Sequence, residues 1–257
     1  MDLSVIAPMY DEADNVAETV RQVREALVAF AGSWELLLVD DGSTDDSRAR
    51  AEAEAAEDER VRVVGYTPNA GRGKGLRTGF EAARGDVVVT VDFDLSYEPS
   101  HILRLHDALA ADGAPDIVLV SAYMPGGTSE GVPFKRLLAS KAGNWLLRLA
   151  WPQRICTSTC IVRGYRRQAL DALELTQDRK EIHLEILEQA FARGLRIAEI
   201  PGHLRARTRG ASKARLGRSA RSHLAFLARR RPGLVVLAAV LGVAIVTAGV
   251  YAVLRWL

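Results

Sequence analysis

The sequence predicts an α/β protein with a mostly parallel sheet flanked by helices, followed by one C-terminal transmembrane helix. Short apolar runs alternate with helical stretches up to residue 121, polar clusters follow several of these runs, and a long uncharged run lies near the C-terminus. With 257 residues, 48% of them hydrophobic, nine Pro and two Cys, the composition excludes collagen, low-complexity disorder and a disulfide-stapled module. A chain of this length buries a large core without metals or disulfides.

The predicted strands are five short runs rich in β-branched and other apolar residues. They are LSVIAP (3–8), WELLLVD (34–40), VRVVGY (61–66), VVVTVD (87–92) and DIVLVS (116–121). The predicted helices carry alanine, leucine and charges at helical spacing, and they cover 15–30, 45–58, 73–83 and 99–111. Such alternation is typical of βαβ units, so we expect a parallel sheet with helices on both faces.

Polar clusters stand where three of these strands end. The first strand runs into Pro8-Met9-Tyr10-Asp11-Glu12, the second into Asp40-Asp41-Gly42-Ser43, and the fourth into Asp92-Phe93-Asp94-Leu95-Ser96. In open α/β sheets, ligands bind beyond the carboxyl ends of the strands. We therefore expect the functional site at this edge.

Asp92 and Asp94 place two carboxylates close together, which is costly unless a cation or hydrogen bonds offset the repulsion. Mg²⁺ or Mn²⁺ suits such a pair, because hard divalent cations prefer oxygen ligands and often share one or two carboxylates with substrate phosphates. A nucleoside diphosphate fits this arrangement better than a wholly protein cage does. The alternative is a surface turn that happens to hold two acids.

Asp40 and Asp41 suit contacts with a ribose hydroxyl or a base N–H. A dinucleotide fold uses an acid at this place, but it also needs G-x-G-x-x-G after the first strand, where this chain has Ala7-Pro8-Met9-Tyr10. This argues against a NAD site. The segment 69–75 (NAGRGKG) combines three glycines and two cations, which suits a phosphate or a sugar, although it also fits a flexible basic turn and is not a Walker A loop.

The C-terminal part differs from the rest in charge. From Gly202 onward there are 11 Lys or Arg and no acid, which leaves 23 basic and 32 acidic residues in 1–201. Leu234 to Leu254 carries no charge and spans about 31 Å as a helix, enough to cross a bilayer. Three arginines precede this run and only Arg255 follows, so the positive-inside rule places the body in the cytoplasm.

The boundaries follow from this charge pattern. We expect the globular domain over 1–215, a basic juxtamembrane segment over 216–232 and the transmembrane helix over 233–255. Residues 219–231 suit an amphipathic helix on an anionic leaflet or an ordinary solvated helix. The N-terminus shows no signal peptide. Cys156 and Cys160 are expected to stay reduced, since no further ligands for a structural zinc site lie nearby.

The ordered set of motifs resembles the family 2 inverting glycosyltransferases of GT-A fold, and among them the dolichol-phosphate mannose synthase group. The likeness covers about residues 3–215. The motifs that carry it are Pro8-x-Tyr10-x-Glu12, Asp40-Asp41-Gly42-Ser43, Gly71-x-Gly73-x-Gly75, Asp92-x-Asp94-Leu95-Ser96, Ser121-Ala122-Tyr123, Gly126-Gly127 and Arg207-x-x-Gly210-x-Ser212-Lys213.

The resemblance implies a role for each of these positions. The residues that would hold the nucleoside sugar are Pro8, Tyr10, Glu12, Val39, Asp41 and Phe93. Asp92 and Asp94 would be the catalytic pair that binds the diphosphate and its Mg²⁺ or Mn²⁺, with Ser96 where the group often has a Gln that serves the metal. Arg207 and Lys213 would close over the donor phosphates, while Arg136 and Ser140 would contact an acceptor phosphate.

Two positions depart from the group's pattern. Ala122 stands where an Arg commonly grips the acceptor phosphate, and 157–160 (TSTC) replaces the usual Asp-x-Thr-Ser-Gly-type stretch. Glu185 matches a family Glu on the helix before the strand at 199–201.

The expected activity is transfer of a hexose, with inversion, from a nucleoside-diphosphate sugar to polyprenyl phosphate at the cytoplasmic leaflet. A phosphate monoester is mostly ionised at neutral pH, so the nucleophile needs no protein base. The alternatives are transfer to a hydroxyl, which would need a base such as Asp178, Glu181 or Glu185, and a non-catalytic nucleotide-binding membrane module. No nucleic-acid partner is expected; the sequence leaves the sugar, the cation and the oligomeric state open.

Overall fold

The computed structural model describes residues 1–111, 113–206, 225–226, 228–229 and 232–233. Its centre is a seven-stranded sheet in the order β3-β2-β1-β4-β7-β5-β8. The strands are β1 (Leu3–Met9), β2 (Trp34–Asp40), β3 (Val61–Gly65), β4 (Val87–Thr90), β5 (Ile117–Ser121), β7 (Arg163–Arg166) and β8 (Ile197–Pro201). All neighbouring pairs are parallel except those of β7, which runs antiparallel to β4 and β5. A small parallel pair joins β6 (Thr128–Glu130) to β9 (His203–Arg205).

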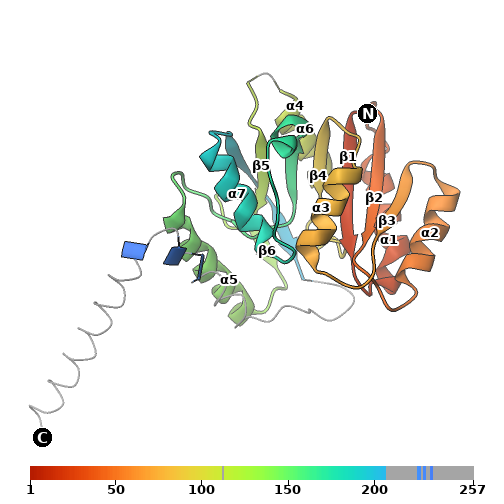
Figure 1. Cartoon of the computed structure of the whole chain (residues 1–257), viewed down its shortest axis with the longest axis horizontal. Helices are drawn as coiled ribbons and strands as arrows, with labels where there is room; N and C mark the ends of the chain where they lie inside the picture. Colours follow the sequence, from red (N-terminus) through yellow and green to blue (C-terminus); the bar gives the residue numbers. More distant parts are fainter. Residues whose placement is uncertain (112, 207–224, 227, 230–231, 234–257) are drawn as a thin grey trace, which may run out of the picture.

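Helices flank this sheet, and α5 projects beyond it (Figure 1). They are α1 (Val16–Ala26), α2 (Ser47–Glu57), α3 (Arg72–Ala82), α4 (His101–Ala110), α5 (Phe134–Leu147), α6 (Arg167–Asp171) and α7 (Ile182–Ala192), with the short turns η1 (Ala13–Asn15) and η2 (Arg148–Ala150). In this view α3 and α7 lie on the near side of the sheet. Helix α3 contacts β1, β2 and β3, while α4 contacts β4, β5 and β7.

The predicted α/β architecture is confirmed. Each of the five predicted strands is present, and each predicted helix stretch contains a helix with ends shifted by a few residues. The middle of β2, Leu36–Val39, is completely buried, as expected for a strand covered on both faces. Sequence reasoning did not predict β7, because Arg163-Gly164-Tyr165-Arg166 lacks the apolar character of a central strand.

Arg163 explains how so polar a strand lies inside the sheet. Its side chain is completely buried, and its guanidinium donates hydrogen bonds to the carbonyl oxygens of Cys160, Ser158 and His183 at 2.7, 2.7 and 3.2 Å. A buried cation needs its donors satisfied. Arg163 therefore fixes the chain that enters β7 and connects it to the start of α7.

Within the described part of the chain, no helix combines the length and the hydropathy that crossing a bilayer requires. The predicted transmembrane helix at 233–255 and most of the juxtamembrane segment at 216–232 lie outside the described residues. Phe226, which is described, is buried and lies with its ring centroid 5.2 Å from that of Trp151, directly after η2.

Candidate active site

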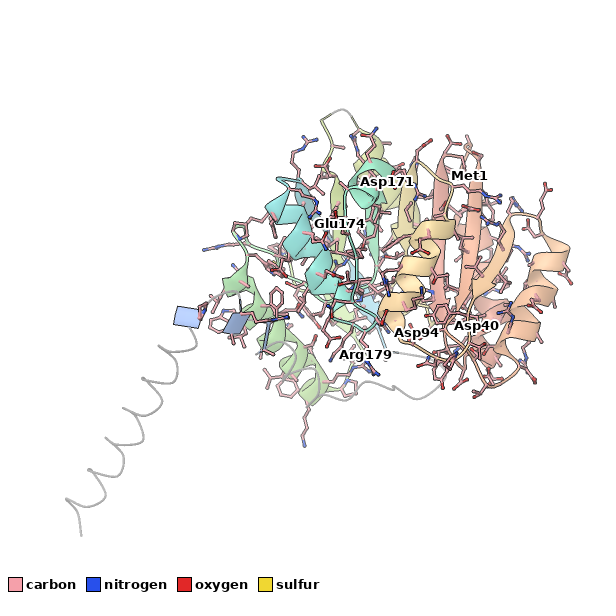
Figure 2. The ribbon with its side chains drawn as sticks, viewed as in Figure 1. Met1, Asp40, Asp94, Asp171, Glu174 and Arg179 are labelled. Atoms are coloured by element: carbon pink, nitrogen blue, oxygen red, sulfur yellow. The ribbon has the colours of Figure 1, made fainter. Side chains whose placement is uncertain are left out.

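The strand ends predicted to carry the chemistry lie at one edge of the sheet. Met9 is paired with Asp40 at the ends of β1 and β2, and the Val91 backbone N–H, just after β4, donates to the Ile6 carbonyl. Figure 2 shows Asp40 and Asp94 at the lower edge of the sheet and Met1 at the opposite, upper edge. The sequence-based prediction that these acids share one edge is confirmed.

The loops after β1 and β2 are tied together by side-chain hydrogen bonds. The Asp11 N–H donates to Ser43 Oγ at 3.0 Å, the Thr44 N–H donates to Asp11 Oδ1 at 2.8 Å, and the Glu12 N–H donates to Ser47 Oγ at 2.7 Å. Asp11 has a positive φ of 49°, a conformation that short polar side chains tolerate better than most. These bonds fix the backbone on both sides of Asp11, and so place Tyr10 and Glu12 beside the end of β2.

Tyr10 and Glu12 both lie partly exposed at this edge. The negative charge of neighbouring Asp11, with smaller contributions from burial and from Asp41, raises the pKa of Tyr10, so its phenol stays protonated and able to donate. The Glu12 carboxylate accepts a 2.6 Å hydrogen bond from Asn15 Nδ2. Their proposed contact with a nucleoside stays a prediction.

Asp41 is only 5% exposed, and its carboxylate is held by neutral donors. It accepts hydrogen bonds from the Tyr66 hydroxyl at 2.7 Å and from the N–H groups of Ala70 and Gly71 at 2.9 Å. Burial and the bond to Asp41 raise the pKa of Tyr66, which keeps it a donor. Asp41 Oδ2 receives one N–H, from Gly71 at 3.0 Å, and a carboxylate oxygen has lone pairs for more.

The glycines at the start of α3 allow close packing of a distant segment. Gly71 has a φ of +112°, and a Cβ on Gly73 would overlap the carbonyl oxygens of Gln177 and Arg179. The Lys74 N–H donates to the Asp178 carbonyl at 3.0 Å. The segment before α7 therefore lies against the start of α3 and brings the exposed Arg179 to the site, a cation that sequence reasoning missed because it is remote in the chain.

Asp92 and Asp94 lie in a tight turn directly after β4. The Leu95 N–H donates to the Asp92 carbonyl at 3.0 Å, and Leu95 has a positive φ of 47°. Ser96 touches both acids: its N–H donates to Asp94 Oδ1 at 3.1 Å, and its hydroxyl lies 3.5 Å from Asp92 Oδ2. The turn thus gathers the two carboxylates and the Ser96 hydroxyl, the three oxygen ligands that the sequence predicted for a metal.

The donor set of this turn fits a hard divalent cation. It offers carboxylate and hydroxyl oxygens only, the ligands that Mg²⁺ and Mn²⁺ prefer. Among the described residues, no group of three or more His, Cys, Asp or Glu side chains is arranged to hold a metal ion. A cation here would need further oxygen ligands, such as those of a diphosphate.

Other side chains frame this turn. The Arg72 guanidinium lies 3.9 Å from Asp92 Oδ1, at the start of α3. Phe93 is buried in the core, and its carbonyl accepts a 2.7 Å hydrogen bond from Thr19. Burial and the charge of Asp92 raise the pKa of the Cys160 thiol to about 12, so this buried thiol is neutral. The predicted nucleoside residue Val39 is likewise buried beneath the edge.

The side of the site beyond β5 is formed by α5 and the loop before β7. The Tyr123 hydroxyl donates to Ser140 Oγ at 2.9 Å, and Lys141 Nζ lies 5.8 Å from the centre of the Tyr123 ring. Arg136, one turn before Ser140, is exposed. Sequence reasoning predicted Arg136 and Ser140 but not Lys141, whose position became apparent only from the packing of α5 on the end of β5.

Two of the three candidate bases are engaged in structural contacts. The Glu185 carboxylate accepts hydrogen bonds from the N–H and hydroxyl of Thr176 and from the Gln177 N–H at 2.7–3.1 Å. Asp178 forms an ion pair with Arg77. These contacts give both carboxylates a role in holding the segment before α7.

The two predicted phosphate-closing cations, Arg207 and Lys213, lie outside the described residues. The chain that leads to them is anchored at the acidic turn, because the Arg205 N–H donates to the Ser96 carbonyl at 2.8 Å and the Arg205 guanidinium pairs with Glu98 at 2.5 Å. A bridge between Tyr97 and Leu204 adds to this contact. Arg207 therefore follows, by two residues, a position fixed beside Asp94.

Three relatives share about a third of their residues with this chain over the aligned regions. The chain is 34% identical over 216 residues to polyprenol monophosphomannose synthase of Mycolicibacterium smegmatis, covering 81% of this chain and 79% of that protein. It is also 34% identical over 203 residues to undecaprenyl-phosphate 4-deoxy-4-formamido-L-arabinose transferase of Klebsiella pneumoniae, covering 77% of this chain and 58% of that protein. Over 207 residues it is 34% identical to glycosyltransferase AglD of Haloferax volcanii, covering 78% of this chain but only 32% of that protein.

The fold has solved counterparts as well. Glucosyl-3-phosphoglycerate synthase from Mycobacterium tuberculosis, solved in complex with Mn²⁺, uridine diphosphate and glucosyl-3-phosphoglycerate, superimposes with a TM-score of 0.67 at 25% identity, covering 89% of this chain and 79% of that one. The model of the family described as "Glycosyl transferase family 2" matches residues 4–174. The chain therefore belongs to glycosyl transferase family 2.

Proposed function

We propose that this protein transfers a hexose, with inversion, from a nucleoside-diphosphate sugar to polyprenyl phosphate. The observation that carries the proposal is that Asp41, Asp92 and Asp94 lie at one sheet edge, next to the side of the site that holds Ser140. The names of the Mycolicibacterium and Klebsiella relatives support a polyprenyl-phosphate acceptor.

On the donor side, the acids have different proposed roles. Asp41, aligned by Tyr66 and the 70–71 backbone, accepts a hydrogen bond from the nucleoside through the free capacity of Oδ2. Asp92, Asp94 and Ser96 hold Mg²⁺ or Mn²⁺. When bound, the cation supplies positive charge that stabilises the leaving diphosphate. Arg72 adds a fixed positive charge beside the same turn, and Arg207 and Lys213 are proposed to add more.

On the acceptor side, positioning takes the place of a base. A phosphate monoester has a second pKa of about 6, so it is mostly a dianion at neutral pH and is already nucleophilic. Arg136, Ser140 and Lys141 on α5 offer two cations and a hydroxyl to hold it. Lys141 supplies a positive charge next to Tyr123, close to the position where Ala122 replaces the arginine expected from the resemblance.

The proposal includes a membrane anchor for the catalytic domain at 1–215. The juxtamembrane segment at 216–232 and the transmembrane helix at 233–255 would hold the domain on the cytoplasmic leaflet of the cell membrane. Anchoring an enzyme beside a lipid acceptor raises the effective concentration of that acceptor without any new contact.

The decisive experiment identifies the product. Purified full-length protein is incubated with a panel of labelled nucleoside-diphosphate sugars, polyprenyl phosphate and Mg²⁺ or Mn²⁺. We expect label in a lipid that mild acid releases, as a glycosyl phosphate should, and no transfer in the presence of a chelator. Label in an acid-stable glycoside would favour a hydroxyl acceptor, and nucleotide binding without transfer to any acceptor would favour a non-catalytic module. Either result would contradict the proposal.

A further inference from the structure

A pocket of about 370 Å³ opens at the edge of the sheet opposite the candidate active site. Figure 2 shows Met1, which lines this pocket, at the upper edge, whereas Asp40 and Asp94 lie at the lower edge. The residues that line it include Phe30, Trp34, Glu59, Arg60, Arg62 and Arg84. Ligand pockets in proteins have volumes of about 300–1,000 Å³, so this pocket has room for a small organic molecule.

Hydrogen bonds between segments that are remote in the chain hold the walls of this pocket in place. The Asp2 carboxylate accepts hydrogen bonds from the N–H and the hydroxyl of Ser33, each at 2.6 Å. The Asp86 N–H donates to the Met1 carbonyl at 2.9 Å. A pocket whose walls are already ordered spares a ligand the entropic cost of ordering them.

Arg84, between α3 and β4, brings to the pocket a cation that no described side chain neutralises. Its backbone N–H donates to Glu35 Oε1 at 2.7 Å and to Ser4 Oγ at 3.1 Å, which fixes the start of the side chain. Its guanidinium, by contrast, forms neither a hydrogen bond nor an ion pair with any residue that the structure describes. A guanidinium has five N–H donors, so Arg84 has all of them available for an anion.

Arg60 and Arg62 add further donors to the same pocket. Within the described residues, Arg62 forms its hydrogen bonds through Nη1, to Glu35 and to the Ala82 carbonyl. Arg60 binds Asp58 through Nε and Nη2, at 2.9 and 3.0 Å. Both guanidinium groups therefore keep N–H donors that these bonds do not use. The Glu35 carboxylate, which is 1% exposed and paired with Arg62, opposes an anion only weakly because its charge is already compensated.

A flat surface lies beside these donors. The guanidinium carbon of Arg60 lies 4.4 Å from the centre of the Trp34 ring, and Trp34 is only 6% exposed, so Arg60 covers the indole. The Arg60 side chain itself is 51% exposed. A guanidinium that stacks on an aromatic ring with one face can stack on the ring of a ligand with the other. Phe30 adds an apolar wall, so the pocket suits a ligand with a flat ring.

We propose that this pocket binds a small phosphate ester that carries a flat ring, with Arg84 as the main contact of the phosphate and Arg60 as the stacking surface for the ring. A phosphate suits the pocket better than a carboxylate does, because its three terminal oxygens can accept hydrogen bonds from guanidinium groups of separate segments. Glu59, an exposed acid in the pocket wall, weakens the binding of the anion. The site lies at the other edge of the sheet from the acidic turn, so it does not depend on the proposed function.

Binding of phenyl phosphate to the purified full-length protein, measured by titration calorimetry, tests the inference. A chelator is present throughout, so that no cation at the acidic turn can bind the phosphate. We expect saturable binding that weakens as salt is added, and weaker binding of inorganic phosphate, which lacks the ring. Arg84→Gln should lower the affinity for phenyl phosphate at least about tenfold, as expected for the loss of a charged hydrogen-bond donor. Glu59→Gln should raise it.

The matched control is Arg104→Gln, which removes an exposed arginine on α4, outside the pocket, and should leave the affinity unchanged. Melting temperatures measured in the same buffer check that each variant is folded. Absence of saturable binding, or equal losses in Arg84→Gln and Arg104→Gln, would overturn the inference. Equal affinities for phenyl phosphate and inorganic phosphate would contradict the stacking on Arg60. None of these measurements involves sugar transfer, so a negative result here would leave the proposed function intact, and a failure of sugar transfer would leave this inference intact.

Discussion

The two edges of the central sheet both bury a carboxylate, but they neutralise it differently. Near the start of β2, Glu35 is 1% exposed, accepts 2.7 Å hydrogen bonds from Ser4 Oγ and the Arg84 N–H, and forms an ion pair with Arg62. Just after β2, Asp41 is 5% exposed and is bonded to a phenol and two backbone N–H groups, with no salt bridge among the described residues. One strand thus carries a fully paired charge at one end and an unneutralised charge at the other.

We interpret the contacts of Glu35 as stabilising the fold and those of Asp41 as preparing a carboxylate for ligand binding. The Glu35 charge is compensated inside the protein, so it contributes to folding and has nothing left to offer a ligand. The Asp41 carboxylate is instead oriented by neutral donors, which is costly for the fold and suits the proposed binding of a nucleoside. The comparison can be tested by removing charge at each edge in turn.

The largest expected effect is that of Asp94→Asn. A cation that loses a carboxylate ligand loses several kcal/mol of charge stabilisation, so kcat/KM should fall at least about 100-fold. Melting temperature should stay close to that of the native protein, because removing one of two adjacent like charges relieves repulsion. Asp107→Asn, at a carboxylate that is 78% exposed on α4, is the matched control. Retained turnover in Asp94→Asn would mean that the acidic turn does not hold the catalytic cation.

At the opposite edge, Glu35→Gln should have the reverse effect, a loss of stability without a loss of activity. It leaves the partly buried Arg62 without its counter-charge, so the free energy of unfolding should drop by about 2 kcal/mol. The kcat/KM of the folded enzyme should be unchanged. Glu52→Gln, at a 55% exposed side chain on α2, should cost far less and serves as the control in the same thermal melts. A large loss of kcat/KM in folded Glu35→Gln would show that Glu35 also affects catalysis, which would contradict the proposed difference between the two edges.

The contribution of Glu35 to the free energy of unfolding should also depend on pH in a defined direction. Burial alone would raise the pKa of Glu35, but the bonds from Ser4 and Arg62 outweigh it and lower the pKa below the ordinary value of 4.5. The stabilisation is therefore fully present above 4.5 and disappears as pH falls through the folded-state pKa. The difference in melting temperature between native protein and Glu35→Gln should be constant near neutrality and shrink in acid. A gap that widened in acid would contradict this sign.

The smallest expected effect is that of Tyr66→Phe. Asp41 loses one of its three hydrogen-bond donors and keeps the N–H groups of Ala70 and Gly71. The loss of one such bond, about 1 kcal/mol, should raise the KM for the donor by about fivefold and leave kcat nearly unchanged. Steady-state kinetics over a range of donor concentrations measures both. An unchanged KM would show that the alignment of Asp41 by Tyr66 does not matter for the donor.

Sequence reasoning predicted that the acids of the candidate site share one sheet edge, but it missed several residues that surround them, for a physical reason. Asp41, Asp92 and Asp94 directly follow runs whose apolar pattern identifies buried strands, and parallel strands end at a common edge, so local signals suffice. Arg179, Lys141 and Cys160 reach the site through packing between segments remote in the chain. The sequence pattern did not predict the antiparallel strand β7, because this strand is held by three carbonyl partners of Arg163 and lacks apolar periodicity.

The anchoring of Arg205 at the acidic turn and of Phe226 on Trp151 has a consequence for the basic segment between them. Arg205 and Phe226 both contact the same body, and the sequence between them carries Arg207 and Lys213. Closing a loop twice as long costs only about 0.6 kcal/mol more. Glycines inserted between these two contacts should therefore cost little stability, whereas a cut between them would leave each contact to hold its own end of the chain.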